Sequence, residues 1–401
     1  MNDLTSVDEA LRLLAEHAPT PTMENVALAD ALGLRLASDV VAQVSRPPAA
    51  VSAMDGYAVR IADVAATGST LDVIGEAPAG APFEGTLGPG QAVRIFTGGV
   101  LPAGADHIVI QEDATRDGDT LTCHRAYDTA EHIRAAGVDF EAGATLLREG
   151  TVLGAAELSL IAAANLATLS VYRRPRVGIL ANGDELRPPG SDLQPGQIVN
   201  SNPIGLSALI SSWGGEAVDL GVAPDDLDAI SERIEAAKRI DIFLPVGGAS
   251  VGDHDLMRPA FAGAGFQSVF EKIAVRPGKP TWFSTKDDAV TLGLPGNPAS
   301  AFVCAWLFLK PLITGQEHSF VPARLCCDLP SNGPRTHFMR ANARITDEGM
   351  VEVKPAGSQD SSLISPFVSG NALLMRKSNS PALVAGECVD VLLMKPLGLS
   401  S

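Results

Sequence analysis

The sequence predicts a multidomain α/β protein, and three observations support this prediction. The chain has 401 residues, which corresponds to two to four domains of about 100–200 residues each. Apolar residues make up 46% of it and charged residues 19%, a balance typical of folded chains with buried cores. The spacing of apolar residues also changes several times along the chain. We therefore expect a central doubly wound, mostly parallel α/β domain, a β-rich second domain, a helical or mixed N-terminal region and a small C-terminal β-barrel or sandwich.

The first two regions differ in the period of their apolar residues. Between Ser6 and Glu16, and again between Leu153 and Ala167, apolar residues recur at helical spacing. These segments predict a mixed N-terminal and linking domain at residues 1–43 and 141–172. Between them, residues 44–140 contain short alternating runs interrupted by Gly and Pro, which are typical of a β-rich domain.

The second half begins with short apolar runs that alternate with helical segments. This alternation over residues 173–322 predicts a parallel sheet covered by helices. The expected strands are 176–181, 241–246 and 290–294, and the expected helices are 203–213, 226–239 and 299–312. Beyond residue 322 the strict alternation returns, so residues 323–401 are predicted to form the C-terminal β domain.

Charge narrows the possible functions. The net charge is −17, which disfavours nucleic-acid binding, and residues 1–172 contain nine Arg, 23 acidic residues and no Lys. An anionic ligand would therefore depend on the second half of the chain, with a divalent cation bridging carboxylates and ligand oxygens. Neither a membrane-spanning run nor a signal peptide is recognisable, so we expect a cytoplasmic protein without membrane contact.

Three loops follow predicted strands of the α/β domain, where ligands bind in folds of this class. The loop at 182–186 carries acids that suit either a ligand or the capping of a helix. The loop at 247–255 combines paired glycines, a serine and two aspartates, a composition that suits a phosphate with a hard cation, although a plain glycine-rich turn remains an alternative. The third candidate combines the loop at 293–300 with the turn at 276–280, which carries Arg276 and Lys279. Both segments are rigid and proline-rich, a feature that also suits a purely structural turn.

Six motifs in this order resemble the molybdopterin molybdenumtransferase family, which includes the bacterial MoeA proteins and the C-terminal domain of gephyrin. They are S-A-M-D-G-Y-A from Ser52, F-T-G-G from Phe96, G-D-E-L from Gly183, G-G-x-S-V-G-D-x-D from Gly247, R-P-G-K-P from Arg276 and L-P-G-N-P-x-S from Leu294. The resemblance covers residues from about 5 to 395. It implies an enzyme that inserts molybdate into adenylylated molybdopterin and releases AMP with the assistance of Mg²⁺.

The resemblance also implies roles for single residues. The expected catalytic residues are Asp55, Glu185 and Asp255, and the expected metal ligands are Glu185, Asp225 and Asp255. The expected substrate-binding residues are Thr97, Gly247, Gly248, Ser250, Arg276, Lys279, Pro295, Pro298 and Ser361. Asp225 and Asp139 match acidic positions of the family less closely than the other residues do.

The chain departs from the family pattern at three places. Asn182 stands where Thr commonly precedes G-D-E, Val246 replaces the Ser of S-G-G, and residues 357–363 differ from the usual C-terminal motif. The resemblance further implies a homodimer with shared active sites and a molybdopterin adenylyltransferase as a partner. A Mg²⁺-dependent nucleotide phosphohydrolase and a non-catalytic pterin-binding scaffold are the alternative functions.

Overall fold

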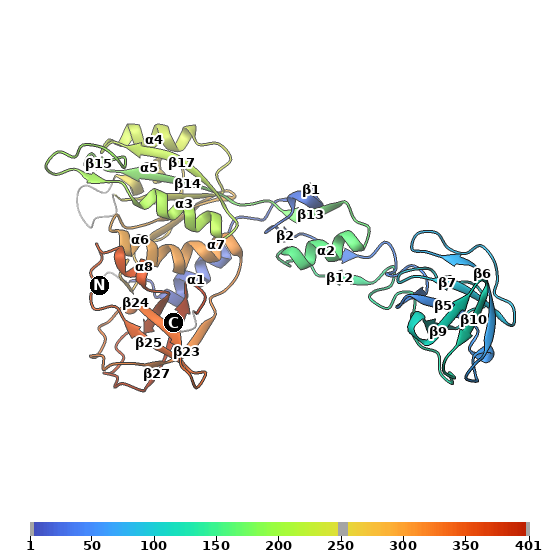
Figure 1. Ribbon diagram of the computed structural model, residues 1–401. Helices are drawn as coiled ribbons and strands as arrows, with labels where there is room; N and C mark the ends of the chain where they lie inside the picture. Colours follow the sequence, from blue (N-terminus) through green and yellow to red (C-terminus); the bar gives the residue numbers. More distant parts are fainter. Residues whose placement is uncertain (1–3, 248–255, 398–401) are drawn as a thin grey trace. The chain divides into compact units, whose positions relative to one another are not determined.

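The computed structural model describes residues 4–247 and 256–397, and the chain divides into two compact units. The first unit combines Met1–Pro21 with Arg174–Ser401, and the second unit is Thr22–Arg173 (Figure 1). The finer domain boundaries expected from the sequence stay predictions. None of the helices in the described ranges is long and apolar enough to cross a membrane.

A six-stranded sheet dominates the second unit, with strand order β8-β5-β7-β6-β10-β9. Its neighbours are antiparallel except for β6 and β7, which run parallel. Alternate residues such as Leu71 and Val73 of β6 are buried while those between them are exposed. The strands are β5 (Gly56–Val59), β6 (Thr70–Ala77), β7 (Gln91–Ile95), β8 (His107–Ile110), β9 (Ala114–Asp117) and β10 (Thr120–Cys123), with 3₁₀ turns η2 (Ile61–Asp63) and η3 (Gln111–Asp113).

The rest of the second unit consists of smaller sheets and one helix. A three-stranded sheet has the order β1-β13-β2, and two strand pairs are β3 with β12 and β4 with β11. Ile161 of the helix packs in one core with Leu36 and Val171 of the three-stranded sheet. The elements are β1 (Met23–Ala27), η1 (Leu28–Asp30), β2 (Arg35–Leu36), β3 (Val40–Val41), β4 (Val51–Ser52), β11 (Ile133–Arg134), β12 (Thr145–Leu147), α2 (Ala155–Ala163) and β13 (Thr168–Tyr172).

The first unit contains the expected doubly wound sheet, with strand order β17-β14-β18-β22-β21-β19. The first four strands are parallel, and β21 runs antiparallel to both of its neighbours, β22 and β19. Side chains of β14 alternate between the two faces, since Ile179 packs in one core and Leu180 in the other. The strands are β14 (Arg176–Asn182), β17 (Glu216–Ala223), β18 (Ile242–Val246), β19 (Gln267–Phe270), β21 (Trp282–Lys286) and β22 (Ala289–Gly293), and a separate pair is β15 (Leu186–Arg187) with β16 (Ile198–Val199).

Helices cover both faces of this sheet (Figure 1). Helix α3 and the segments α6, η4 and α7 share a core on one face, while α4 and α5 share a core on the other. Asp226 caps α4 by accepting the backbone N–H of Ala229 (2.9 Å). The helices are α3 (Asn202–Ser212), α4 (Leu227–Ala236), α5 (Met257–Gly263), α6 (Pro298–Cys304), the π-helical η4 (Ala305–Leu309) and α7 (Lys310–Thr314).

The predicted N-terminal helix is present as α1 (Val7–Glu16), with Ser6 as its cap. Its buried stripe, Val7, Ala10 and Leu14, belongs to the core of the α/β sheet in the first unit. We expected this segment within the mixed N-terminal domain instead. Amphipathic spacing shows that a face is buried, but not which part of the chain covers it.

The C-terminal region forms a closed five-stranded barrel. Its strands run in the order β24-β25-β23-β27-β26, and pairing of β26 with β24 closes the circle. This result decides between the two expected architectures in favour of the barrel. The strands are β23 (Phe320–Leu325), β24 (Thr336–Ile345), β25 (Val351–Pro355), β26 (Ala372–Arg376) and β27 (Cys388–Leu393); β20 (Val275–Arg276) adds to β24, and α8 (Ser365–Ser369) precedes β26.

Candidate functional site

The carboxyl ends of three parallel strands meet at one edge of the α/β sheet. Asn182 ends β14 opposite Ala223 of β17, and Gly247 directly follows β18. Gly247 has a φ of +99°, and a Cβ atom there would lie 2.8 Å from the backbone oxygen of Asn182. Any larger residue would clash with this backbone, so glycine is required where the loops converge.

Asn182 and two aspartates form a hydrogen-bonded group at this edge. The Nδ2 of Asn182 donates to Oδ1 of Asp225 (2.8 Å) and to the carbonyl of Pro224 (3.2 Å). The backbone N–H of Asp184 donates to Oδ2 of Asp225 (3.4 Å), and the N–H of Asp225 donates to Oδ1 of Asp184 (3.3 Å). Asn182 is 4% exposed, whereas both aspartates are exposed. The buried side chain of Asn182 thus holds Asp225 in place, while the carboxylates of Asp184 and Asp225 are exposed to solvent.

Glu185 lies next to this group on the same loop. Its carboxylate folds over Gly183, where an added Cβ would lie 2.5 Å from Oε2 of Glu185. The backbone carbonyl of Glu185 accepts the N–H of Ile198, which fixes the start of the β15–β16 pair (3.0 Å). The side chain is exposed, so it is available to a ligand.

The expected metal site is only partly in view. Among residues 4–247 and 256–397, no group of three or more His, Cys, Asp or Glu is arranged to hold a metal ion. The expected ligand Asp255 lies outside the described residues, as do Gly248 and Ser250 of the glycine-rich loop. Glu185 and Asp225 offer carboxylate oxygens, which are the ligands that Mg²⁺ prefers.

The basic turn is held rigidly by its neighbours. Gly278 has a φ of +117°, and an added Cβ would collide with the Sγ of Cys304. Burial raises the pKa of the Cys304 thiol to about 12, so this cysteine serves as a packing residue. Arg276 is exposed, Lys279 is half-buried, and neither forms an ion pair with another described residue. Both cations are therefore available to an anion.

The last loop of the sheet lies beside the glycine turn. Gly247 donates its N–H to the carbonyl of Leu294 (3.2 Å), and the Nδ2 of Asn202 donates to the carbonyl of Gly296 (2.7 Å). Pro295 is buried, and Pro298 occupies the first position of α6, where its missing N–H costs nothing. The two prolines therefore shape the loop.

Ser361 from the divergent C-terminal motif reaches this loop. Its Oγ accepts a hydrogen bond from Nδ2 of Asn297 (3.1 Å), and its carbonyl accepts the N–H of Ala299 (3.0 Å). The structure thus joins the 357–363 segment to the start of α6.

Sequence reasoning missed Arg340, which holds the segment of Ser361 in place. Its side chain is fully buried, and Nη1 donates to the carbonyls of Asp360 (2.9 Å) and Leu363 (2.9 Å). Burial lowers the pKa of the guanidinium. The available signal was an arginine between the apolar residues Phe338 and Ala341; with His337, it is one of two polar residues at the buried positions of this strand.

In the second unit, Asp55 and Thr97 are brought together from two strand ends. The Oδ1 of Asp55 accepts both the backbone N–H of Thr97 (2.7 Å) and its hydroxyl (2.8 Å). These hydrogen bonds, together with the nearby guanidinium of Arg94, lower the pKa of Asp55. Gly56 follows directly, and a Cβ there would collide with the carbonyl of Val109. Asp139, by contrast, forms an exposed ion pair with Arg46 (3.6 Å).

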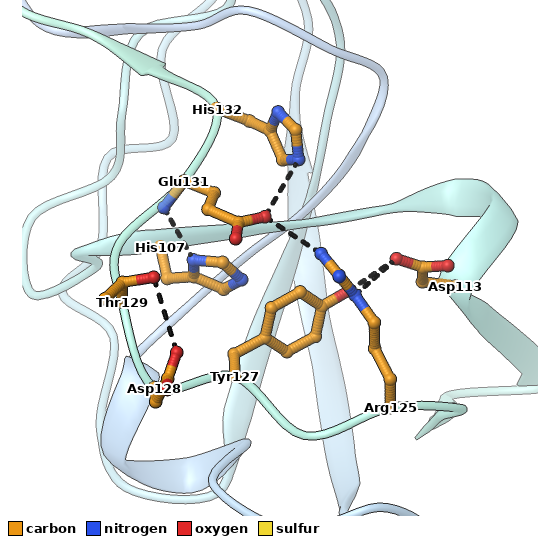
Figure 2. Close-up of polar contacts among 8 residues, drawn as sticks. All are labelled: His107, Asp113, Arg125, Tyr127, Asp128, Thr129, Glu131 and His132. Carbon is orange, nitrogen blue, oxygen red and sulfur yellow. Dashed lines mark hydrogen bonds and ion pairs between the residues drawn. The ribbon is translucent and has the colours of Figure 1, made fainter.

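A second polar network surrounds the buried His107 (Figure 2). The Nδ1 of His107 accepts the backbone N–H of Glu131 (3.0 Å). Arg125 forms ion pairs with Asp113 and with the side chain of Glu131, both at 2.8 Å. Tyr127 packs against His107, with ring centroids 4.3 Å apart, and donates its hydroxyl to Asp113 (2.9 Å).

This network lies away from Asp55 within the second unit. His107 pairs with Val59 at one end of β5, whereas Gly56, next to Asp55, pairs with Ile110 at the other end. The network therefore braces the loop that leads to β11, and we assign no ligand to it.

Comparison with known proteins identifies the family. The MoeA N-terminal region (domain I and II) matches residues 5–165, a probable molybdopterin binding domain matches 178–315, and the MoeA C-terminal region (domain IV) matches 322–394. A molybdopterin molybdenumtransferase from Nostoc sp. is 37% identical over 376 residues, which cover 90% of this chain and 84% of the relative. The chain belongs to the molybdopterin molybdenumtransferase family.

Further relatives support this assignment over the full length. The molybdopterin molybdenumtransferase of Haemophilus influenzae is 35% identical over 97% of this chain and 98% of its own. Two solved structures of the Pyrococcus horikoshii molybdopterin biosynthesis MoeA protein match with TM-scores of 0.85 and 0.80, at 29% and 30% identity, over 98% of this chain and 100% of theirs. The predicted family, fold class and role in molybdenum cofactor biosynthesis are confirmed.

Proposed function

We propose that this chain inserts molybdate into adenylylated molybdopterin, with Mg²⁺-dependent release of AMP. The proposal rests on the group of side chains at one edge of the α/β sheet in the first unit. Exposed carboxylates of Glu185 and Asp225 lie there with the glycine turn at Gly247. Membership in the molybdopterin molybdenumtransferase family supplies the reaction class.

The residues fit an anionic substrate and a hard cation. Arg276 and Lys279 would bind phosphate or molybdate oxygens, because both are cations without an ion-pair partner among the described residues. Glu185 and Asp225 would hold Mg²⁺ through carboxylate oxygens, and Asp255 is proposed as a third ligand on the basis of its motif. A bound Mg²⁺ would stabilise negative charge that develops on phosphate oxygens.

Other residues would shape the substrate site. Gly247, whose own N–H bonds the carbonyl of Leu294, and Gly248 would leave room for the backbone to approach a phosphate, and Ser250 would add a hydroxyl donor. Pro295 and Pro298 would keep the adjacent loop rigid, with Ser361 bonded to it. Asp55 and Thr97 would contribute a fixed hydrogen-bond acceptor from the second unit.

We further propose a cytoplasmic homodimer in which Asp55 and Thr97 of one chain complete the site of the other. The charge distribution supports this, since residues 1–172 carry a net charge of −14 and no lysine. Acidic residues of that kind can face an anion only where the opposite wall supplies cations. The dimer would receive its substrate from a molybdopterin adenylyltransferase.

The direct test is AMP release by the purified chain. With Mg²⁺ and adenylylated molybdopterin, AMP should appear only when molybdate is also present. AMP release independent of molybdate would instead indicate a nucleotide phosphohydrolase. Tight pterin binding without any AMP release would indicate a scaffold.

A further inference from the structure

The side chain of Asn182 forms its hydrogen bonds outside its own strand. Asn182 ends β14, and its amide reaches across to the segment that follows β17, 41 to 43 residues later in the chain. There it meets the carbonyls of Ala223 (3.5 Å) and Pro224 (3.2 Å) as well as the carboxylate of Asp225 (2.8 Å). The shortest of these contacts is the one to the carboxylate.

The side-chain amide of Asn182 is buried next to the carboxylate of Asp225. Asn182 is 4% exposed, while Asp225 is exposed, so the donor is shielded from water and the acceptor faces it. A buried donor that lost its acceptor would carry a desolvation cost, which favours the bonded arrangement. The amide therefore restricts where the carboxylate can point.

The other oxygen of Asp225 is held from the opposite side. Its Oδ2 accepts the backbone N–H of Asp184 (3.4 Å), while Oδ1 accepts the amide of Asn182. Each carboxylate oxygen has about two lone-pair sites, so one on each oxygen remains open to solvent. Asp184 lies alongside with its own carboxylate bonded to the N–H of Asp225 (3.3 Å).

We propose that Asn182 is a positioning residue, which orients the carboxylate of Asp225 for a divalent cation. Groups behind a metal ligand fix its orientation, and their loss typically weakens metal binding by about 10–100-fold. The inference rests on the proposed function, because it assigns Asp225 to the Mg²⁺ site. It concerns a residue at which this chain departs from the Thr expected directly before the G-D-E-L motif.

The difference between Asn182 and the Thr of the family predicts that two substitutions of Asn182 weaken cation binding to different degrees. A threonine hydroxyl has one proton to donate, whereas the amide of Asn182 has two and bonds both Pro224 and Asp225. Asn182→Thr can hold either the carbonyl or the carboxylate, and Asn182→Val, of nearly the same shape as Thr, can hold neither. The difference between these two variants isolates the donated hydrogen bond.

The experiment measures Mn²⁺ binding to the full chain without substrate, from the electron paramagnetic resonance signal of free Mn²⁺. Asp225→Asn serves as the reference for loss of the site. Asn182→Val should weaken Mn²⁺ binding by about 10-fold, and Asn182→Thr by a smaller factor. Mg²⁺ titrations of AMP release should show the same order in the Mg²⁺ concentration required, with maximal turnover at saturating Mg²⁺ changed less.

A matched control separates positioning from stability. Asn332 also uses its Nδ2 to bind carbonyls, those of Arg335, Arg376 and Lys377, but it donates no hydrogen bond to a carboxylate of residues 4–247 or 256–397. Asn332→Val should lower the melting temperature and leave the Mn²⁺ affinity unchanged. Asn182→Thr provides a second variant if Asn182→Val folds poorly.

The outcomes are distinct. Equal Mn²⁺ affinity of the wild type, Asn182→Thr and Asn182→Val would overturn the inference, as would a wild type that does not bind Mn²⁺ at a site lost in Asp225→Asn. Absence of molybdate-dependent AMP release with the graded Mn²⁺ affinities intact would overturn the proposed function alone.

Discussion

Two aspartates, one in each unit, show two ways of holding a carboxylate. Asp55 of the second unit receives both donors of Thr97 on a single oxygen, and these bonds lower its pKa. Asp225 of the first unit receives one donor on each oxygen, from Asn182 and Asp184, and lies beside another carboxylate. The first arrangement suits a fixed hydrogen-bond acceptor. The second leaves a lone pair open on each oxygen, which suits a metal ligand.

The two units also differ in how their cations are paired. Most arginines of the second unit are paired with acids, for example Arg125 with Asp113 and Arg148 with Asp39. Arg276 and Lys279 of the first unit have no such partner in the described ranges. We infer that the first unit supplies the chemistry and the charge for binding anions, while the second supplies a rigid acceptor.

The largest expected effect tests the chemical role of the first unit. Glu185→Gln should keep the fold, because the side chain is exposed and the amide has the same shape. Turnover should fall by about 100-fold, or about 3 kcal/mol of transition-state stabilisation, because a charge at a metal site is lost. Steady-state AMP release and a melting curve measure both properties. Full activity with an unchanged Mg²⁺ requirement would remove Glu185 from the site.

The next prediction asks whether the two units cooperate across a dimer. Asp55→Ala and Glu185→Ala should each be inactive alone, yet mixing them should restore activity by subunit exchange. Half of randomly exchanged dimers are mixed and each has one intact site, so activity should return to about one quarter of the wild type. Differently tagged chains and a pull-down confirm that mixed dimers form. Mixed dimers without activity would show that each chain builds its own site.

How far the sequence predicts this arrangement depends on the distance along the chain. The ends of β14, β18 and β22 were predictable, because a buried strand and its turn are encoded in adjacent residues. The contact of Ser361 with Asn297 joins residues 64 positions apart, and no local pattern specifies it. The role of Arg340 was missed for the same reason, since its partners are carbonyls, which carry no sequence signal.

A smaller effect is expected at the basic turn. Lys279→Ala should mainly raise KM, by a factor that corresponds to about 1–3 kcal/mol of lost charge-assisted hydrogen bonding. The turn itself should persist, because Gly278 and Cys304 fix its backbone. Initial rates over a range of substrate concentrations separate KM from kcat. Lys272→Ala, a substitution outside the R-P-G-K-P motif, is the control and should leave KM unchanged.

A subtler change is predicted at the acceptor of the second unit. Thr97→Val removes the hydroxyl donor but keeps the backbone N–H, so the pKa of Asp55 should rise part of the way toward its ordinary value. Because the folded-state pKa of Asp55 is depressed, its contribution to stability is present at neutral pH and is lost as the pH falls through that pKa. Carbon-detected NMR titration of the Asp55 carboxyl measures the shift, and Thr97→Ser should retain the wild-type value.

The smallest effect concerns the brace around His107, where burial lowers the pKa of the imidazole. Its Nδ1 accepts the N–H of Glu131, which requires that nitrogen to be unprotonated. Since the folded state disfavours the proton, the unfolded state binds it more readily, and stability should decline as the pH falls below about 6.5, the pKa of an unfolded histidine. Glu131 and Asp106 oppose the shift, while His132 and Arg125 add to it.

Hydrogen exchange of the loop around Glu131 should therefore accelerate between pH 7.5 and 5.5, after correction for intrinsic rates. In His107→Gln, whose side chain does not titrate, this acceleration should be weaker, and an equal acceleration in both proteins would assign the pH dependence to another group.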